Sequence, residues 1–169
     1  MARRLELVSV VLSFAFWLAP AHAQFIPPAW DSILAPEDRF QLVLADAAVL
    51  DRETGLVWER DATTGPDFDW FAAARSCYNK GTGGRKGWRP ATVEELTSLL
   101  IPTEDGFTRP GAPFGIVYTS TWSGSTVAGD NSQAWVIHFS DGDVNAQNKS
   151  NCCGFGVWCV RGRLGHDGK

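Results

Sequence analysis

The chain has 169 residues, of which 44% are hydrophobic, and it carries a formal net charge of −4. That length is enough for one domain with a sizeable core and is short for two. The acidic balance argues against nucleic acid as a partner, because binding a polyanion requires clustered positive charge.

The first residues have the pattern of a signal peptide. Two arginines precede an apolar run over residues 7–18, and Ala21 and Ala23 supply the small residues before a signal-peptidase cut. We predict a signal peptide over residues 1–23; an uncleaved anchor is the weaker alternative, since the run is shorter than the roughly 20 residues that span a bilayer. The protein is accordingly expected to be exported, periplasmic or secreted, without membrane insertion after cleavage.

Residues 24–39 contain three prolines and little periodicity, which favours a linker or a loosely packed arm. The folded domain is predicted over residues 40–162. Residues 40–44 are typical of a strand. Residues 49–58 are typical of a hairpin, in which Gly55 adopts the positive φ that its turn needs.

Two helices are predicted next. Apolar residues at helical spacing predict the first helix and form one stripe on its inward face: Trp70, Ala73, Ala74, Cys77 and Tyr78. Thr92 and Glu95 form a capping box in front of the second helix, which is expected to end at Pro102. Its apolar positions are Val93, Leu96, Leu99 and Leu100.

Strand patterns return in the second half of the chain. A proline- and glycine-rich excursion over residues 102–116 is expected to be irregular, and the tail over 163–169 to be flexible. Strands are predicted at residues 117–123, 134–140 and 157–161, with a turn at 141–143 and a polar stretch over 144–151. This order predicts an α+β fold, with helices outside an antiparallel sheet in which the two chain ends meet.

Six segments carry a family resemblance: residues 51–58, the helix with Cys77, and residues 88–96, 120–123, 134–139 and 159–161. In that order they resemble the Lcl C-terminal domain family, a bacterial family of domains of unknown function. The resemblance implies a C-type-lectin-like fold with two helices, an antiparallel sheet and long irregular loops. It also implies binding outside the cytoplasm, because the family's founding member carries an adhesin-like module for surface polysaccharides.

Two features depart from the family pattern. Pro90 and Ala91 stand where the family usually has leucine and proline, which predicts an altered entry to the second helix. Adjacent Cys152 and Cys153 are not a family feature either, so the family's binding loop is not transferred onto these residues.

All four cysteines lie in the exported part, where an oxidising compartment favours disulfide bonds over thiols or zinc. We predict a bridge between Cys77 and Cys159, because it ties the inner face of the first helix to the last strand. Cys152 and Cys153 then form a vicinal bridge, bond another chain or stay reduced, and the vicinal bridge is the favoured interpretation. Adjacent cysteines do not match zinc-ligand spacing, so no metal is predicted.

Three groups of residues that could serve in catalysis, metal binding or ligand binding are interpreted as structural. No motif places a nucleophile and a carboxylate around His138, so it is interpreted as an ordinary sheet residue, and no catalytic residue is assigned. The acidic turn at 141–143 lacks the fuller spacing of a calcium loop. Arg89 is predicted to pair with Glu94 and Glu95 and to lock the second helix to its entry.

The tryptophans within the motifs are predicted to lie in the core: Trp58, Trp88, Trp122 and Trp135. Strand alternation gives Trp158 an outward-facing position instead.

Polar residues around the strand over 134–140 are the predicted ligand surface: Asp130, Asn131, Gln133, Asn145, Gln147, Asn148, Lys149 and Asn151. Amides and a lysine can hydrogen-bond sugar hydroxyls or a protein backbone, and irregular segments on a rigid sheet often carry binding sites. A hydrophilic loop without a partner is the open alternative, and no cofactor is expected.

The sequence therefore predicts an exported, non-catalytic recognition module that binds carbohydrate or a protein surface of the envelope. Two alternatives stay open. One is a structural envelope protein without a ligand. The other is an oxidase-like enzyme that uses Cys152 and Cys153, since some relatives by fold are oxidases with a cysteine pair.

Overall fold

The computed structural model describes residues 34–65, 68–103, 106–108, 110–115, 117–152 and 154–162. The predicted signal peptide, most of the predicted linker and the tail over 163–169 lie outside these residues. No helix in the described part of the chain is long and apolar enough to cross a bilayer.

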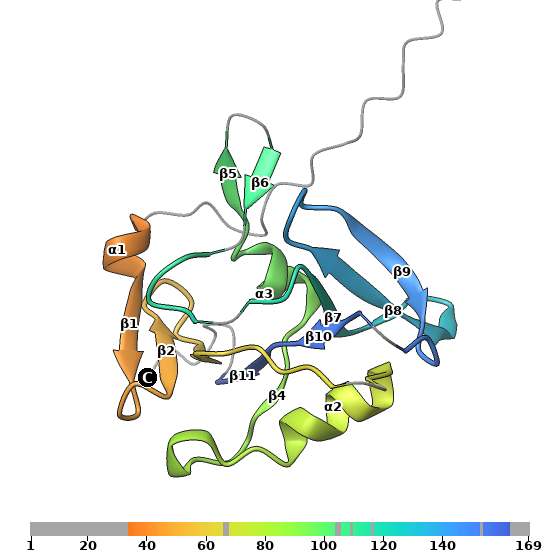
Figure 1. Ribbon diagram of the computed structural model, residues 1–169, viewed down its shortest axis with the longest axis horizontal. Helices are drawn as coiled ribbons and strands as arrows, with labels where there is room; N and C mark the ends of the chain where they lie inside the picture. The colour runs from red at the N-terminus through yellow and green to blue at the C-terminus, as the bar shows by residue number, and fades with distance from the viewer. Residues whose placement is uncertain are drawn as a thin grey trace, which may run out of the picture.

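The first sheet joins the two ends of the domain. Its strand order among the described residues is β1 (Phe40–Val43), β2 (Ala48–Asp51), β3 (Val57–Glu59), β11 (Cys159–Arg161) and β4 (Arg89–Pro90), all antiparallel. The last strand thus lies between the third and fourth strands (Figure 1). This arrangement confirms the predicted meeting of the chain ends in one sheet.

The β2–β3 hairpin forms as predicted. Gly55 has φ 73°, a backbone conformation that favours glycine. Asp51 N–H donates to the Leu56 carbonyl, and Gly55 N–H donates to the Asp51 carbonyl, both at 2.8 Å.

The second sheet has the order β10 (Gly156–Val157), β7 (Ser120–Val127), β8 (Asp130–His138) and β9 (Val144–Asn148). The β10–β7 pair is parallel and the other pairs are antiparallel. The polar stretch predicted over 144–151 is therefore partly a strand. It lies at the edge of the sheet, where one face of a strand can stay polar.

The first predicted helix is α2 (Trp70–Tyr78), capped by the Asp69 side chain, which accepts from Ala72 N–H at 2.7 Å. Ala73, Ala74 and Cys77 are buried as predicted, but Tyr78 is 65% exposed. At 3.6 residues per turn, position 78 lies about 90° away from the centre of the buried stripe. The inward prediction for Tyr78 was therefore wrong.

The second predicted helix is α3 (Val93–Thr97), and its capping box is confirmed. The predicted end at Pro102 was wrong, because the helix stops at Thr97 and residues 101–103 already form a strand. The buried Glu95 accepts from Thr92 N–H at 2.8 Å and receives two bonds from Arg89 at 2.6 and 2.7 Å. Glu95 thus carries the predicted ion pair, whereas Glu94 is exposed. These hydrogen bonds raise the pKa of the Arg89 guanidinium.

Two elements appear in segments that were expected to be irregular. Residues assigned to the linker include α1 (Pro36–Arg39), whose last residue is buried against the domain. The excursion after α3 contains the β5 (Ile101–Thr103) and β6 (Gly106–Thr108) hairpin, which projects from the rest of the molecule (Figure 1). The predicted α+β class is confirmed, because a few short helices flank mainly antiparallel sheets.

The core has two clusters of buried side chains with aromatic residues in each. Trp158, expected to face outward, is fully buried in the first cluster, where its ring lies 5.6 Å from that of Trp58. Its Nε1 donates to the Glu59 carbonyl at 2.8 Å. Residues 157–160 are all buried because they run between the two clusters, so alternation does not predict an exposed face there. Trp135, expected in the core, is only half-buried.

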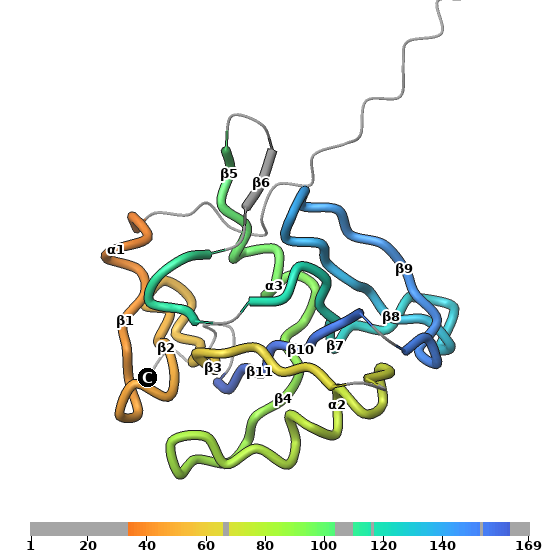
Figure 2. Tube along the Cα trace, viewed as in Figure 1, coloured from red at the N-terminus to blue at the C-terminus, as the bar shows by residue number. Residues whose placement is uncertain are grey.

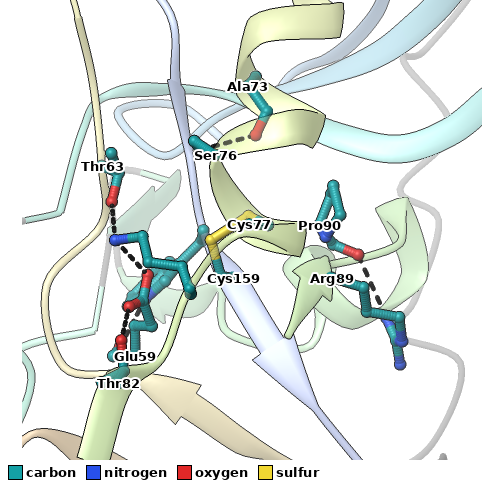
Figure 3. Close-up of a disulfide and its surroundings, with 11 residues drawn as sticks. Glu59, Thr63, Ala73, Ser76, Cys77, Thr82, Arg89, Pro90 and Cys159 are labelled. Carbon is teal, nitrogen blue, oxygen red and sulfur yellow. Dashed lines mark hydrogen bonds and ion pairs between the residues drawn. A yellow bond between two sulfur atoms is a disulfide. The ribbon is translucent and has the colours of Figure 1, made fainter. Parts of the chain in front are cut away.

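The predicted disulfide between Cys77 and Cys159 is confirmed, with a Cα–Cα distance of 5.4 Å. Figure 3 shows the bridge between α2 and β11. Beside it, the buried Glu59 side chain accepts from the Thr82 hydroxyl and pairs with Lys80 at 3.1 Å. Lys80 lies just after α2, so this ion pair and the disulfide attach the same end of the helix to the sheet.

Candidate functional site

The candidate site lies on the β8–β9 hairpin and on β7 beside it (Figure 2). Gly142 has φ 79° at the hairpin turn, and its N–H donates to the His138 carbonyl at 2.8 Å. The Asp141 carboxylate accepts from Asp143 N–H at 3.0 Å. These bonds confirm the turn predicted at residues 141–143.

Cross-strand pairing places polar residues on one face of this sheet. Ser120 lies opposite His138, and Asn145 lies opposite Val136. Directly paired residues share a face, and so do residues two apart along a strand. Ser120, His138, Asn145 and Gln147 therefore face the same way.

These side chains form a continuous row of contacts with Asn151, which we call the polar ladder (Ser120, His138, Asn145, Gln147 and Asn151). Asn151 Nδ2 donates to Gln147 Oε1 at 3.1 Å, and Gln147 Nε2 donates to Asn145 Oδ1 at 3.0 Å. Asn145 Nδ2 lies 3.1 Å from His138 Nε2, and His138 Nδ1 lies 2.8 Å from Ser120 Oγ. The ladder thus crosses three neighbouring strands.

Asp143 sets the direction of hydrogen bonding along the ladder. Its Oδ2 accepts from Asn145 Nδ2 at 3.0 Å. An ionised carboxylate can only accept, so the amide nitrogen of Asn145 must face Asp143 and His138. The amide then donates to His138 Nε2, and the neutral imidazole carries its proton on Nδ1, from which it donates to Ser120 Oγ.

This proton arrangement differs from that of a nucleophilic serine with its base. Such a serine needs an imidazole nitrogen that accepts its proton. Here the nitrogen beside Ser120 is the one that donates. The geometry therefore favours a hydrogen-bonding role for Ser120 and His138 over nucleophilic catalysis.

We expect the neutral ring of His138 to be the Nδ1–H tautomer, and long-range ¹H–¹⁵N spectra of labelled protein in alkaline buffer test this. The substitution Asn145→Asp replaces the donor at Nε2 by an acceptor and should move the proton to Nε2. The substitution Asn131→Asp, at an exposed position outside the ladder, serves as the control and should leave the tautomer unchanged. An Nε2–H signal from His138 in the unaltered protein would contradict the described orientation of Asn145.

Asp130 lies at the end of the β8–β9 hairpin away from its turn, and its carboxylate accepts hydrogen bonds from neighbouring residues. Its Oδ1 accepts from Ser132 N–H at 2.9 Å and from Ser132 Oγ at 2.6 Å, and its Oδ2 accepts from Gln133 Nε2 at 2.9 Å. The bonds from Ser132, followed by smaller contributions from Gln133 and Lys149, lower the pKa of Asp130. This end of the hairpin therefore presents a negative charge beside the exposed Asn131.

Lys149 lies inside the fold, with only 8% of its surface exposed. Its Nζ donates to Thr126 Oγ1 at 2.8 Å and lies 4.2 Å from the centre of the Trp70 ring. The Lys149 carbonyl accepts from Trp70 N–H at 3.1 Å. Lys149 thus connects the hairpin to the start of α2, a position that suits a structural role better than the predicted ligand contact.

The residues that follow β9 are hydrogen-bonded to Asn148, the last residue of that strand. Asn148 Oδ1 accepts from Ser150 N–H at 3.0 Å and from Ser150 Oγ at 2.8 Å. Cys152 follows at an exposed position, whereas Cys153 lies outside the described residues. The vicinal bridge between these two cysteines stays a prediction.

The structure divides the predicted ligand residues into three groups. Three belong to the ladder: Asn145, Gln147 and Asn151. Four lie at the end of the hairpin away from its turn: Asp130, Asn131, Gln133 and Asn148. The last, Lys149, is buried.

Three residues that the sequence analysis did not assign to the ligand surface take part in the hydrogen bonds of the polar ladder: Ser120, His138 and Asp143. The alternation of Asn145 and Gln147 around Ala146 was the available signal for a strand beside β8. Among the described residues, no group of three or more His, Cys, Asp or Glu side chains is placed to hold a metal ion.

Comparison with protein families gives a single family assignment. Residues 47–161 match the model of the Lcl C-terminal domain, whereas no curated protein matches the chain. The matched residues make up most of the chain and contain the six motifs that carry the resemblance. The chain therefore belongs to the Lcl C-terminal domain family.

Proposed function

We propose that the protein is an exported, non-catalytic recognition module that binds carbohydrate through the polar ladder. The observation that supports this role most directly is the row of hydrogen-bonded amide, imidazole and hydroxyl groups on one face of β7, β8 and β9. The signal-peptide pattern and the buried disulfide support export, because disulfides persist in oxidising compartments.

The ladder retains hydrogen-bonding capacity of both kinds. Gln147 uses one of its two amide hydrogens toward Asn145, and its oxygen accepts one bond from Asn151. A carboxamide offers two donors and two acceptor positions, so Gln147 still has one donor and one acceptor to offer. Asn145 gives its two amide hydrogens to Asp143 and His138 and accepts one bond from Gln147, so it still has one acceptor position to offer. Sugar hydroxyls both donate and accept, and they match this surface.

The contacts within the ladder also hold the amides in place before a ligand arrives. Asn145 is fixed from three directions, by Asp143, His138 and Gln147. Ordering rotamer-rich side chains on binding costs affinity, and groups that are already ordered avoid that cost.

A glycan array probed with the purified protein tests the proposal, followed by affinity measurements on the sugars that bind. The substitutions Asn145→Ala and Gln147→Ala should each lower affinity by about tenfold, because each removes one or two ligand hydrogen bonds. Gln41→Ala is the matched control, since Gln41 is an exposed amide on β1 of the other sheet.

Two results would count against the proposal. Unchanged affinity in both ladder variants would move the binding site elsewhere on the domain. No binding on the array, together with no envelope protein retained by the immobilised chain, would favour a structural protein without a ligand.

A further inference from the structure

A second surface, formed by α2 and the residues after it, differs in chemistry from the polar ladder. The segment from residue 70 to residue 93 contains no aspartate or glutamate, although the whole chain is acidic. It contains five basic residues: Arg75, Lys80, Arg85, Lys86 and Arg89. Positive charge is therefore concentrated in one part of an acidic protein.

Two of these cations are engaged within the fold. Lys80 pairs with Glu59 at 3.1 Å, and Arg89 pairs with Glu95 at 2.6 Å. Arg75, Arg85 and Lys86 are exposed, and none of the three forms an ion pair with a described carboxylate. Their charges are available to an external partner.

Two aromatic side chains accompany these cations. Phe71 is 54% exposed and Tyr78 is 65% exposed, and both belong to α2. Phe71, Arg75 and Tyr78 are separated by four and three residues, so they lie on one face of the helix. This face points away from the buried Ala73, Ala74 and Cys77.

The helix and the following turn lie along one side of the molecule. In Figure 1, α2 runs along the lower edge, and the chain continues along the same edge into the loop before β4. That loop contains η1 (Thr82–Gly84), directly before Arg85 and Lys86. We call the residues Phe71, Arg75, Tyr78, Arg85 and Lys86 the basic-aromatic face.

We propose that the basic-aromatic face docks the protein on an anionic lipid surface. Exposed aromatic side chains enter the boundary between lipid headgroups and acyl chains, and basic residues around them are attracted to anionic headgroups. The face is the outer side of a helix, and a bilayer surface can deform around such a shape.

Other anionic partners fit this face less well. A peptide normally adds to a sheet edge or enters a groove, and the outer side of α2 is neither. A soluble polyanion satisfies the three cations but leaves the benzyl group of Phe71 in water. The combination of charge with exposed aromatic surface therefore favours lipid.

Co-sedimentation of the purified chain with vesicles tests this inference. Phosphatidylcholine vesicles that contain phosphatidylglycerol should bind the protein, pure phosphatidylcholine vesicles should not, and high salt should weaken binding. Arg85→Glu should lower the partition coefficient about fivefold or more, the factor for one cation near such a surface. Phe71→Ser should lower it about tenfold through lost apolar burial.

The matched control is Arg52→Glu, which makes the same charge change at an exposed position in the β2–β3 turn. It should leave the partition coefficient within about twofold, because the site lies away from the docking face. Equal losses in Arg52→Glu and Arg85→Glu would overturn the inference, as would equal binding to both kinds of vesicle. Binding to soluble dextran sulfate that is unaffected by Phe71→Ser, without vesicle binding, would assign the face to a polyanion instead.

Discussion

Loss of the Cys77–Cys159 disulfide is expected to lower the free energy of unfolding by about 4 kcal/mol. The two cysteines are 82 residues apart in the sequence. In the chain-entropy model, a bridge over a loop of this length stabilises the fold by restricting the unfolded chain. The bridge also joins α2, whose outer side is the proposed lipid contact, to β11 within the first sheet.

Urea unfolding of the double variant Cys77→Ala/Cys159→Ala measures this effect. Both cysteines are fully buried, so reductant added to the native protein should leave the bridge intact, whereas reductant added to the unfolded protein should break it. Reductant added to the double variant is the control, because it reports the contribution of Cys152 and Cys153 alone. A variant within about 1 kcal/mol of the unaltered protein would contradict the expectation.

The parts of the fold that were predictable from sequence depend on residues close together in the chain. The capping box needs only Thr92 and Glu95, which are three positions apart, and both of its hydrogen bonds are present. Gly55 fixes the β2–β3 turn through its own backbone conformation. The Cys77–Cys159 pair was an exception, because it was inferred from a helix face and a strand that are far apart in the sequence.

The errors arose where burial depends on neighbours that are distant in sequence. Strand alternation assumes one buried face and one exposed face. Trp158 breaks this assumption because core residues lie on both sides of its segment. Trp135 shows the opposite error, because it was expected in the core and is only half-buried. It pairs with Ala146 on the edge strand.

The candidate site was predictable as a region but not as a network. The amides of Asn145 and Gln147 mark a polar segment from composition alone. Their contact with His138 depends on the register between β8 and β9, and the contact of His138 with Ser120 depends on the register between β7 and β8. Because Val144 and Ala146 are the whole apolar face of β9, its sequence carried little information about that register.

Replacement of Asp51 by alanine is the second change with a large expected effect, a loss of about 3 kcal/mol in the free energy of unfolding. Asp51 is fully buried and accepts two bonds from Arg39, at 2.9 Å from Nε and 2.7 Å from Nη2. Arg39 also donates to the Ser98 carbonyl at 3.0 Å, which joins α1 to the end of α3. The variant leaves the buried guanidinium with a weaker partner, Glu53, at 3.3 Å.

A double-mutant cycle with Arg39→Met separates the ion pair from simple loss of packing. Each single variant leaves one buried charge without its main partner, whereas the double variant removes both charges. The double variant should therefore be more stable than the sum of the single losses predicts, by about 2 kcal/mol. Asp38→Ala, at an exposed position on α1, is the control and should change stability by less than about 0.5 kcal/mol. Additive losses of less than about 1 kcal/mol each would show that Arg39 and Asp51 are not coupled, and that α1 is held to the domain by other contacts.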